Sequence, residues 1–194
     1  MTMSLSLPPI IFLDIDGVLN VNKVVWRTLP VGLPKPGRAY KRPPRRLERE
    51  REFSCHAVTQ LERLVRQTGA LLVLSSSWRL RQGARETLAG HGVIGPWHDD
   101  WRTDALAGGR GAQISRWLAR NGSPRHVILD DWPHELREHG ATLVRIDDRI
   151  GLTRELASRA GEIIYQQRFQ CSPAVSIADQ VAAHAAGGGD RGRR

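Results

Sequence analysis

The chain has 194 residues, which is enough for one domain with a sizeable core and short for two. Its two cysteines are too few for a disulfide framework, so the composition excludes a disulfide-stapled secreted fold and indicates the reducing cytoplasm. The formal net charge of +9 indicates an anionic partner, but nearly all of the excess lies in residues 35–51 and 187–194. The rest of the chain is therefore close to neutral.

An apolar run near the N-terminus ends on two carboxylates and a glycine. Residues 9–13 precede Asp14, Asp16 and Gly17. A run that is apolar on both faces is typical of a strand inside a parallel sheet, and such sheets carry their functional groups at the carboxyl ends of the strands. Since side chains alternate along a strand, we expect Asp14 and Asp16 to face one metal ion or one phosphorus atom together. The run is too short for a transmembrane helix and lacks the basic start of a signal peptide, so we expect no membrane partner.

The next segment, residues 21–53, differs in composition from the run before it. It is rich in proline and arginine, and residues 35–51 hold eight basic side chains against two acidic ones. We expect an irregular, loop-like excursion from the core. A basic segment of this kind fits two interpretations, an ordinary solvated loop and a contact with a nucleic-acid backbone.

Helices and strands alternate after this insertion. Ser54 is a helix cap and Gly69 a helix stop, and together they predict a helix over residues 54–68. The other expected elements are a strand over 70–74, a helix over about 81–89, loops over 91–109, a helix from Gly108 to about 121, strands over 126–129 and 142–146, and a helix from about 153 to 168. Residues 173–194 are rich in Ala, Gly and Arg and predict a flexible tail. This order predicts one α/β domain over residues 7–172, with a doubly wound, mostly parallel sheet.

Three of the predicted strands end on residues that suit metal or phosphate chemistry. Asp14 and Asp16 follow the first strand, Ser75 and Ser76 the second, and Asp130 and Asp131 the third. In a parallel sheet these strand ends meet at one crevice. A cluster of carboxylates repels itself unless a cation lies among them, and an all-oxygen set of ligands suits Mg²⁺. We therefore expect a magnesium site.

Four segments in this order resemble a known family. They are Leu-Asp-Ile-Asp-Gly-Val-Leu-Asn, Leu-Ser-Ser-Ser-Trp-Arg, Arg-Gly-Ala-Gln-Ile-Ser-Arg-Trp-Leu and Ile-Leu-Asp-Asp. The chain resembles the haloacid dehalogenase-like (HAD) superfamily over roughly residues 10–153, and in finer detail it is similar to the HAD domain of Swiss-army-knife RNA repair proteins. The resemblance implies a HAD-like, Rossmannoid fold with a small loop-type cap insertion.

The resemblance also implies a mechanism and roles for the site residues. Asp14 would be the nucleophile that forms an aspartyl-phosphate, and Asp16 would protonate the leaving oxygen and later deprotonate water. Asp14, the carbonyl group of Asp16 and Asp130 would hold Mg²⁺, with Asp131 supporting that shell. Ser75 and Ser76 would contact the phosphoryl oxygens. The implied activity is a phosphatase, a hydrolase that acts on phosphoric esters.

The resemblance fails at one position. Members of the superfamily place a Lys before the strand that carries Asp130, whereas no Lys follows Lys41 in this chain. Two arginines can replace it as the phosphate-binding cation, Arg110 at the start of a predicted helix and Arg79 after the second strand. Because Arg and Lys are not equivalent, a second function stays open, a nucleic-acid-binding module that keeps the fold without turnover. A phosphorylated receiver domain also clusters aspartates at strand ends, but Asp16 argues against it.

The size of the chain bears on the substrate. It leaves no room for a large lid domain, so we expect an open crevice that admits a phosphate on a bulky group, such as an RNA or DNA end. Trp78 and Trp132 lie near predicted site residues, where they either pack against the core or stack on a base or sugar. The sequence leaves the oligomeric state open.

Overall fold

A five-stranded parallel sheet lies at the centre of the computed structural model, which describes residues 7–28 and 45–170. The strand order is β5-β4-β1-β6-β7, and every neighbouring pair is parallel. The strands are β1 (Ile10–Leu13), β4 (Leu71–Leu74), β5 (Trp97–Arg102), β6 (His126–Asp130) and β7 (Leu143–Arg145). The predicted α/β class with a mostly parallel sheet is confirmed.

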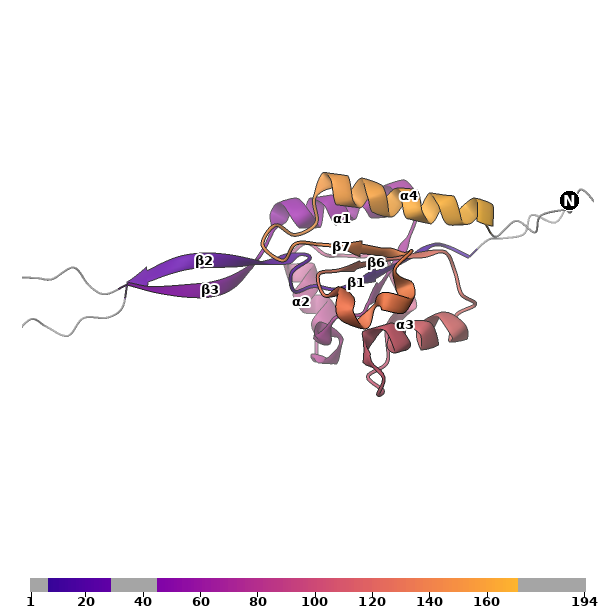
Figure 1. Ribbon diagram of the computed structural model, residues 1–194, viewed down its shortest axis with the longest axis horizontal. Helices are drawn as coiled ribbons and strands as arrows, with labels where there is room; N and C mark the ends of the chain where they lie inside the picture. Colours follow the sequence, from indigo (N-terminus) through magenta and orange to yellow (C-terminus); the bar gives the residue numbers. More distant parts are fainter. Residues whose placement is uncertain (1–6, 29–44, 171–194) are drawn as a thin grey trace, which may run out of the picture.

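Helices cover both faces of this sheet (Figure 1). Helices α1 (Cys55–Thr68) and α4 (Arg154–Gln170) lie along one face, and α3 (Gly109–Arg120) lies on the other. The short α2 (Ala84–Gly90) adds Leu88 to the same core cluster as α1 and α4. The central strand β1 has no exposed side, because Ile11 and Leu13 enter this cluster while Ile10 and Phe12 enter the cluster under α3. Within the described residues, no helix has the length and apolar character needed to cross a bilayer.

Helix α1 forms where its capping residues predict it. The Ser54 hydroxyl accepts a hydrogen bond from the Ala57 amide at 3.3 Å, which satisfies one of the free amides of the first turn. At the other end, Gly69 adopts a left-handed conformation with φ of 65° and donates its amide hydrogen to the Val65 carbonyl.

One sheet strand was not expected. Residues 91–109 were predicted to be loops, but Trp97–Arg102 form β5 at the edge of the sheet. Its side chains are half-buried or exposed without strict alternation, and its register against β4 shifts between Leu72 and Leu74. The prediction was wrong because an irregular edge strand lacks the apolar alternation that identifies a regular one.

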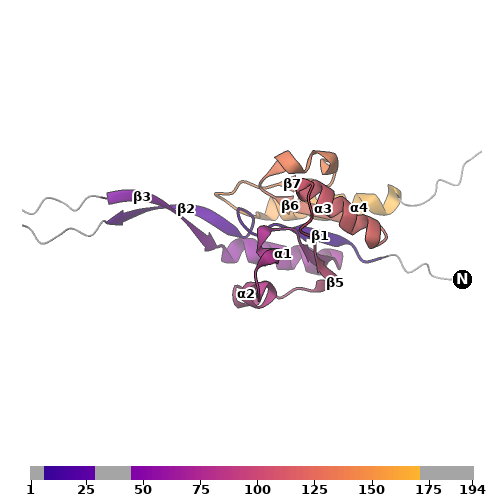
Figure 2. The same ribbon diagram turned by 90° about the horizontal axis from the view of Figure 1, so that it is seen from below.

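The insertion is also more regular than expected. Strands β2 (Asn20–Thr28) and β3 (Arg45–Phe53) pair as an antiparallel ribbon, with Asn20 opposite Phe53 and Thr28 opposite Arg45. Figures 1 and 2 both show this ribbon extending away from the sheet and its helices. The expectation of an irregular segment is therefore wrong at both ends of the insertion. Residues 29–44 and the predicted flexible tail, 173–194, lie outside the described residues.

Candidate active site

The candidate site lies where β1, β4 and β6 end. Asp14 follows β1 directly, Ser75 follows β4, and Asp130 is the last residue of β6. Backbone hydrogen bonds tie these ends together: the Asp14 amide donates to the Leu129 carbonyl and the Ser75 amide to the Leu13 carbonyl, both at 3.0 Å. The sheet itself thus fixes where these three residues lie.

Three carboxylates meet at this point. One oxygen from each of Asp14, Asp130 and Asp131 lies within 4.8 Å of the other two, a spacing that suits a shared metal ion. Asp14 is 4% exposed, Asp130 is completely buried and Asp131 is half-buried. Burial, with a further contribution from the Asp14 charge, raises the pKa of both Asp130 and Asp131 to about 6. A bound cation would relieve this crowding of negative charge.

A tight turn after β1 makes room for Asp131. Gly17 has a φ of +82°, a conformation that favours glycine, and its amide donates to the Asn20 carbonyl at 2.8 Å. A β-carbon at position 17 would lie 2.3 Å from the Asp131 carboxylate oxygen Oδ2. Gly17 is therefore required for the close approach of the turn to Asp131.

Asp16 takes a different direction from the one its spacing predicts. Its carboxylate accepts a hydrogen bond from Asn20 Nδ2 at 3.1 Å and pairs with Arg51 Nη1 at 2.7 Å. Within the described structure it lies outside the group formed by Asp14, Asp130 and Asp131. The reason is that β1 ends at Leu13, so the alternation of side chains along a strand no longer governs residue 16.

Arg110 lies among the acids. It stands in the first turn of α3, and its Nη1 atom lies 3.1 Å from Asp14 Oδ2 and also contacts Asp130 Oδ2. Burial alone would lower the pKa of this guanidinium, but Asp14 and Asp130 outweigh burial and raise it above its ordinary value. The main-chain amide of Arg110 donates a hydrogen bond to Glu135 Oε2 at 3.0 Å. Of the two arginines considered from the sequence, Arg110 is the one that contacts the carboxylates.

Arg79 has another arrangement, which the sequence did not indicate. Its Nη1 atom donates to the carbonyl oxygens of Ser75 and Ser76 at 3.0 and 2.7 Å, and its Nη2 donates to Gln113 Oε1 at 2.7 Å. Nε donates to the Asp104 carbonyl at 3.3 Å. The side chain is buried, and burial together with repulsion from Arg110 lowers its pKa. Arg79 therefore joins the serine loop to α3 and to the segment before it.

The two serines differ in how their hydroxyls are bound. The Ser75 hydroxyl is fully buried and has no hydrogen-bond partner among the described residues. A buried hydroxyl without a partner is costly, which favours a ligand at this point. The Ser76 hydroxyl instead accepts a hydrogen bond from the Trp78 amide at 3.4 Å and caps the 3₁₀ turn Ser77–Leu80.

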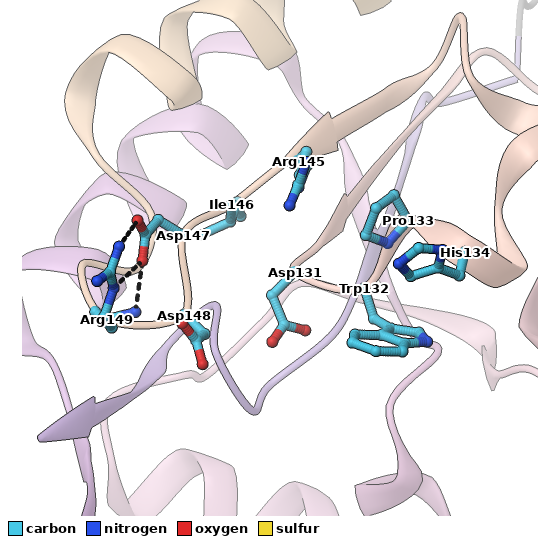
Figure 3. A pocket seen from close by; sticks show the side chains of 9 residues that line it. All are labelled: Asp131, Trp132, Pro133, His134, Arg145, Ile146, Asp147, Asp148 and Arg149. Atoms are coloured by element: carbon cyan, nitrogen blue, oxygen red, sulfur yellow. Dashed lines mark hydrogen bonds and ion pairs between the residues drawn. The ribbon is translucent and has the colours of Figure 1, made fainter.

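An open pocket of about 530 Å³ adjoins the carboxylate group (Figure 3). Asp131 lies on its wall, so the pocket reaches the candidate metal site. Asp147 accepts three hydrogen bonds from Arg149, two from the guanidinium and one from the main-chain amide, and these lower the pKa of Asp147 to about 2. Asp148 accepts a hydrogen bond from Asn22. Sequence reasoning missed most of this wall, which comprises Asp131, Trp132, Pro133, His134 and residues 145–149.

Residues 10–157 match the family described as the HAD domain in Swiss Army Knife RNA repair proteins. The match covers more than half of the chain and contains the three strand ends described above. Comparison with curated proteins and with solved structures gives no match.

Proposed function

Because the chain belongs to the HAD domains of Swiss Army Knife RNA repair proteins, we propose that it is a magnesium-dependent phosphatase that works through an aspartyl-phosphate. The observation that carries this proposal is the meeting of Asp14, Asp130 and Asp131 at the ends of adjacent strands. The buried hydroxyl of Ser75, which has no partner in the described structure, supports a phosphate-binding role for the same crevice.

The donor set suits magnesium. All the side-chain donors are carboxylate oxygens, which Mg²⁺ prefers, and they are close enough to share one ion. Asp14, Asp130 and the carbonyl group of Asp16 would hold it, with Asp131 binding it directly or through water. When bound, the ion supplies the positive charge that allows a carboxylate to approach a phosphate dianion.

The proposed reaction has two steps. First, a carboxylate oxygen of Asp14 attacks the phosphorus atom in line, and the bond between phosphorus and the leaving oxygen breaks while Asp16 donates a proton to that oxygen. Second, water attacks the same phosphorus atom and gives a proton to Asp16. The bond between phosphorus and Asp14 then breaks, which releases inorganic phosphate and restores both aspartates. Asp16 must exchange its contact with Arg51 for the leaving group to act in this way.

Arg110 and Ser75 support the phosphoryl group. Arg110 already contacts Asp14 and Asp130, so its guanidinium replaces the Lys of other superfamily members as a cation beside the nucleophile. The Ser75 hydroxyl has a free proton to donate to a phosphoryl oxygen. Arg79, whose donors mostly bind main-chain carbonyls, acts as a positioning residue for the serine loop.

We propose an RNA or DNA end as the substrate class. The pocket beside the acids is open, which suits a phosphate attached to a large molecule. The basic insertion reaches the site directly, since Arg51 of β3 pairs with Asp16 and Asn22 of β2 binds Asp148. Positive charge next to a phosphate site favours a polyanionic substrate.

Release of inorganic phosphate tests the proposal. We expect turnover of p-nitrophenyl phosphate and of phosphorylated oligonucleotides with Mg²⁺, and none with EDTA or in Asp14→Asn. Asp99→Asn is the matched control, because it removes the same charge from an exposed aspartate of β5, which lies at the edge of the sheet opposite β7. Turnover that persists in EDTA or in Asp14→Asn would contradict the mechanism.

One observation favours a second candidate function, a nucleic-acid-binding module without turnover. Arg110 contacts both Asp14 and Asp130, so it partly neutralises the two acids that the mechanism needs for nucleophile and metal. The phosphate-release experiment separates the two functions. Tight binding of oligonucleotides without any phosphate release would establish the binding module.

A further inference from the structure

The pocket next to the carboxylate group contains residues that the proposed mechanism does not use. Asp131 belongs to both the pocket and the candidate metal site, so anything bound in the pocket lies against the reacting phosphate. Its volume of about 530 Å³ falls within the roughly 300–1,000 Å³ of typical small-ligand sites. The pocket therefore has the size and the place to hold the group that carries the phosphate.

Trp132 presents an aromatic face in this pocket. Its side chain is 58% exposed, whereas the other four tryptophans with described side chains are buried or half-buried. Its backbone position is fixed, because its amide donates to Asp130 Oδ1 at 2.8 Å and Pro133 begins a 3₁₀ turn directly after it. The ring of His134 lies 4.8 Å away, tilted by 58°. An exposed indole held next to a phosphate site is suited to stack on a nucleobase.

Arg145 provides a basic side chain on the same wall. It is the last residue of β7 and is exposed, and its side chain forms no hydrogen bond or ion pair with any residue in the described ranges, although its charge helps to lower the pKa of Asp147. The guanidinium of Arg149, in contrast, is paired with Asp147 through two hydrogen bonds. Figure 3 shows Trp132 to the right of Asp131 and Arg145 above it, in the same pocket. A free guanidinium at this position suits the next phosphate of a nucleotide chain.

We infer that the pocket binds the terminal nucleoside of a phosphorylated strand, with Trp132 stacking on its base and Arg145 binding the adjoining phosphodiester. This inference rests on the proposed function, because it places the scissile phosphate at the carboxylate group. It adds the part of the substrate that the pocket binds, the terminal base and the next phosphate, and the residues that select it. The enzyme then distinguishes nucleotides from other phosphate esters by the base.

Paired substrates test the role of Trp132. The pairs are oligonucleotides that carry a terminal phosphate on either a normal or an abasic last residue, in 3′-phosphate and 5′-phosphate forms. We expect the wild type to prefer the base-bearing end by about 10-fold in kcat/KM, in at least one of the two forms. Trp132→Ala should lower kcat/KM far more for the base-bearing end than for the abasic end and so remove this preference, while Trp132→Phe should retain most of it.

Phe169→Ala is the matched control for lost aromatic surface. Phe169 is 64% exposed and stands near the end of α4, away from the pocket residues. We expect this variant to keep the full preference for the base. An equal loss in Trp132→Ala on base-bearing and abasic substrates, or no loss on either, overturns the inference.

Arg145→Gln tests the second contact. We expect it to weaken binding of a dinucleotide more than of a mononucleotide and to reduce the salt dependence of binding by about one phosphate contact. Arg159→Gln, an exposed arginine on α4, is the charge-matched control and should change neither quantity. Equal effects of the two substitutions would show that Arg145 acts only through net charge, and the inference would fail for this residue.

A binding measurement keeps this inference separate from the proposed function. In an Asp14→Asn background with Mg²⁺, calorimetry compares base-bearing and abasic ends, with and without Trp132→Ala. If the wild type shows no turnover but binding still prefers the base-bearing end, and Trp132→Ala removes that preference, the nucleoside pocket is supported and the phosphatase is refuted. Turnover without any base preference supports the phosphatase and refutes the nucleoside pocket.

Discussion

The parallel sheet and the antiparallel ribbon contribute to the site in different ways. The ends of β1, β4 and β6 carry Asp14, Ser75 and Asp130, and apolar residues bury those strands on both faces. The ribbon of β2 and β3 stands outside the sheet and contacts the site at its base, through Asn20, Asn22 and Arg51. The sheet thus sets the positions of the side chains that the proposed reaction uses, and the ribbon places positive charge next to them.

This difference implies that changes in the two regions have different consequences. A change at the strand ends alters metal binding and chemistry, because the carboxylates are crowded and buried there. Under the proposed function, a change in the ribbon should alter the binding of a polyanionic substrate, because charge acts over about 10 Å at ordinary ionic strength. The following predictions test that separation, in order of expected size.

The largest effect is expected for Arg110→Ala. It leaves the completely buried Asp130 without its guanidinium partner, which costs on the order of 3 kcal/mol in the free energy of unfolding, and it lowers kcat about 100-fold. Arg110→Lys should keep most of the activity, since it restores a cation beside Asp14. Denaturant unfolding and phosphate release measure the two effects. Unchanged turnover in Arg110→Ala would show that Arg110 plays no part in the chemistry.

Gly17→Ala should affect the metal site next most strongly. The new β-carbon would lie 2.3 Å from Asp131 Oδ2, so Asp131 must move, and we expect a loss of about 10- to 100-fold in Mg²⁺ affinity. Gly69→Ala is the matched control, because Gly69 also has a positive φ but no atom lies within 4 Å of its added β-carbon. Both variants should lose about 1 kcal/mol of stability from backbone strain, and Gly17→Ala alone should lose Mg²⁺ affinity. Equal Mg²⁺ affinities, measured by calorimetry, would refute the steric argument.

The pKa values at the strand ends predict how stability depends on pH. Asp130 and Asp131 have pKa values raised to about 6, compared with about 3.9 in an unfolded chain. The folded protein therefore binds protons at these two carboxylates more tightly than the unfolded chain does. Without Mg²⁺, the free energy of unfolding should consequently fall as the pH rises from about 4 to 6 and then become level. Saturating Mg²⁺ should reduce this slope, and Asp130→Asn should remove about half of it, because Asp131 keeps its own raised pKa. A rise in stability over this pH range in the absence of metal would contradict the predicted direction.

The smallest effects are expected in the ribbon. The pairing of β2 with β3 places positions 45, 49 and 51 on the same face as Asn22, and positions 27 and 46 on the opposite face. We expect Arg45→Gln with Arg49→Gln to lower kcat/KM a few-fold for oligonucleotides and to reduce the salt dependence by about two phosphate contacts. Arg27→Gln with Arg46→Gln, which removes the same charge, should have a smaller effect. Turnover of p-nitrophenyl phosphate should change in neither double variant, and equal effects of the two would show that only total charge matters.

The elements that the sequence predicted are those with strong local signals. Strand β1 is a continuous apolar run, and α1 begins and ends at Ser54 and Gly69 as their capping chemistry requires. The meeting of Asp14 with Asp130 followed from one rule, that parallel strands end at a common edge. Local patterns were sufficient for these elements because the residues that determine them, the apolar run of β1 and the caps of α1, belong to the element itself or lie directly beside it.

Other features depended on contacts that local sequence does not encode. Arg79 and Arg110 both follow polar loops, and only the packed structure shows that Arg79 binds the carbonyls of Ser75 and Ser76 while Arg110 contacts the acids. The ribbon was missed because its strands are rich in charged residues and lack apolar alternation. The direction of Asp16 depends on Arg51, which lies 35 residues further along the chain.

The backbone hydrogen bonds between Leu13, Leu129, Asp14 and Ser75 have a wider consequence. They make the spacing between Asp14, the proposed nucleophile, and its neighbours Ser75 and Asp130 a property of the sheet and not of the insertion or of the loop after β7. The parts that choose the substrate can therefore be exchanged without rebuilding the reactive centre. A designer who wants a new specificity can replace the part of the hairpin beyond Asn22 and Arg51, which bind Asp148 and Asp16, and keep the strand ends beneath it unchanged.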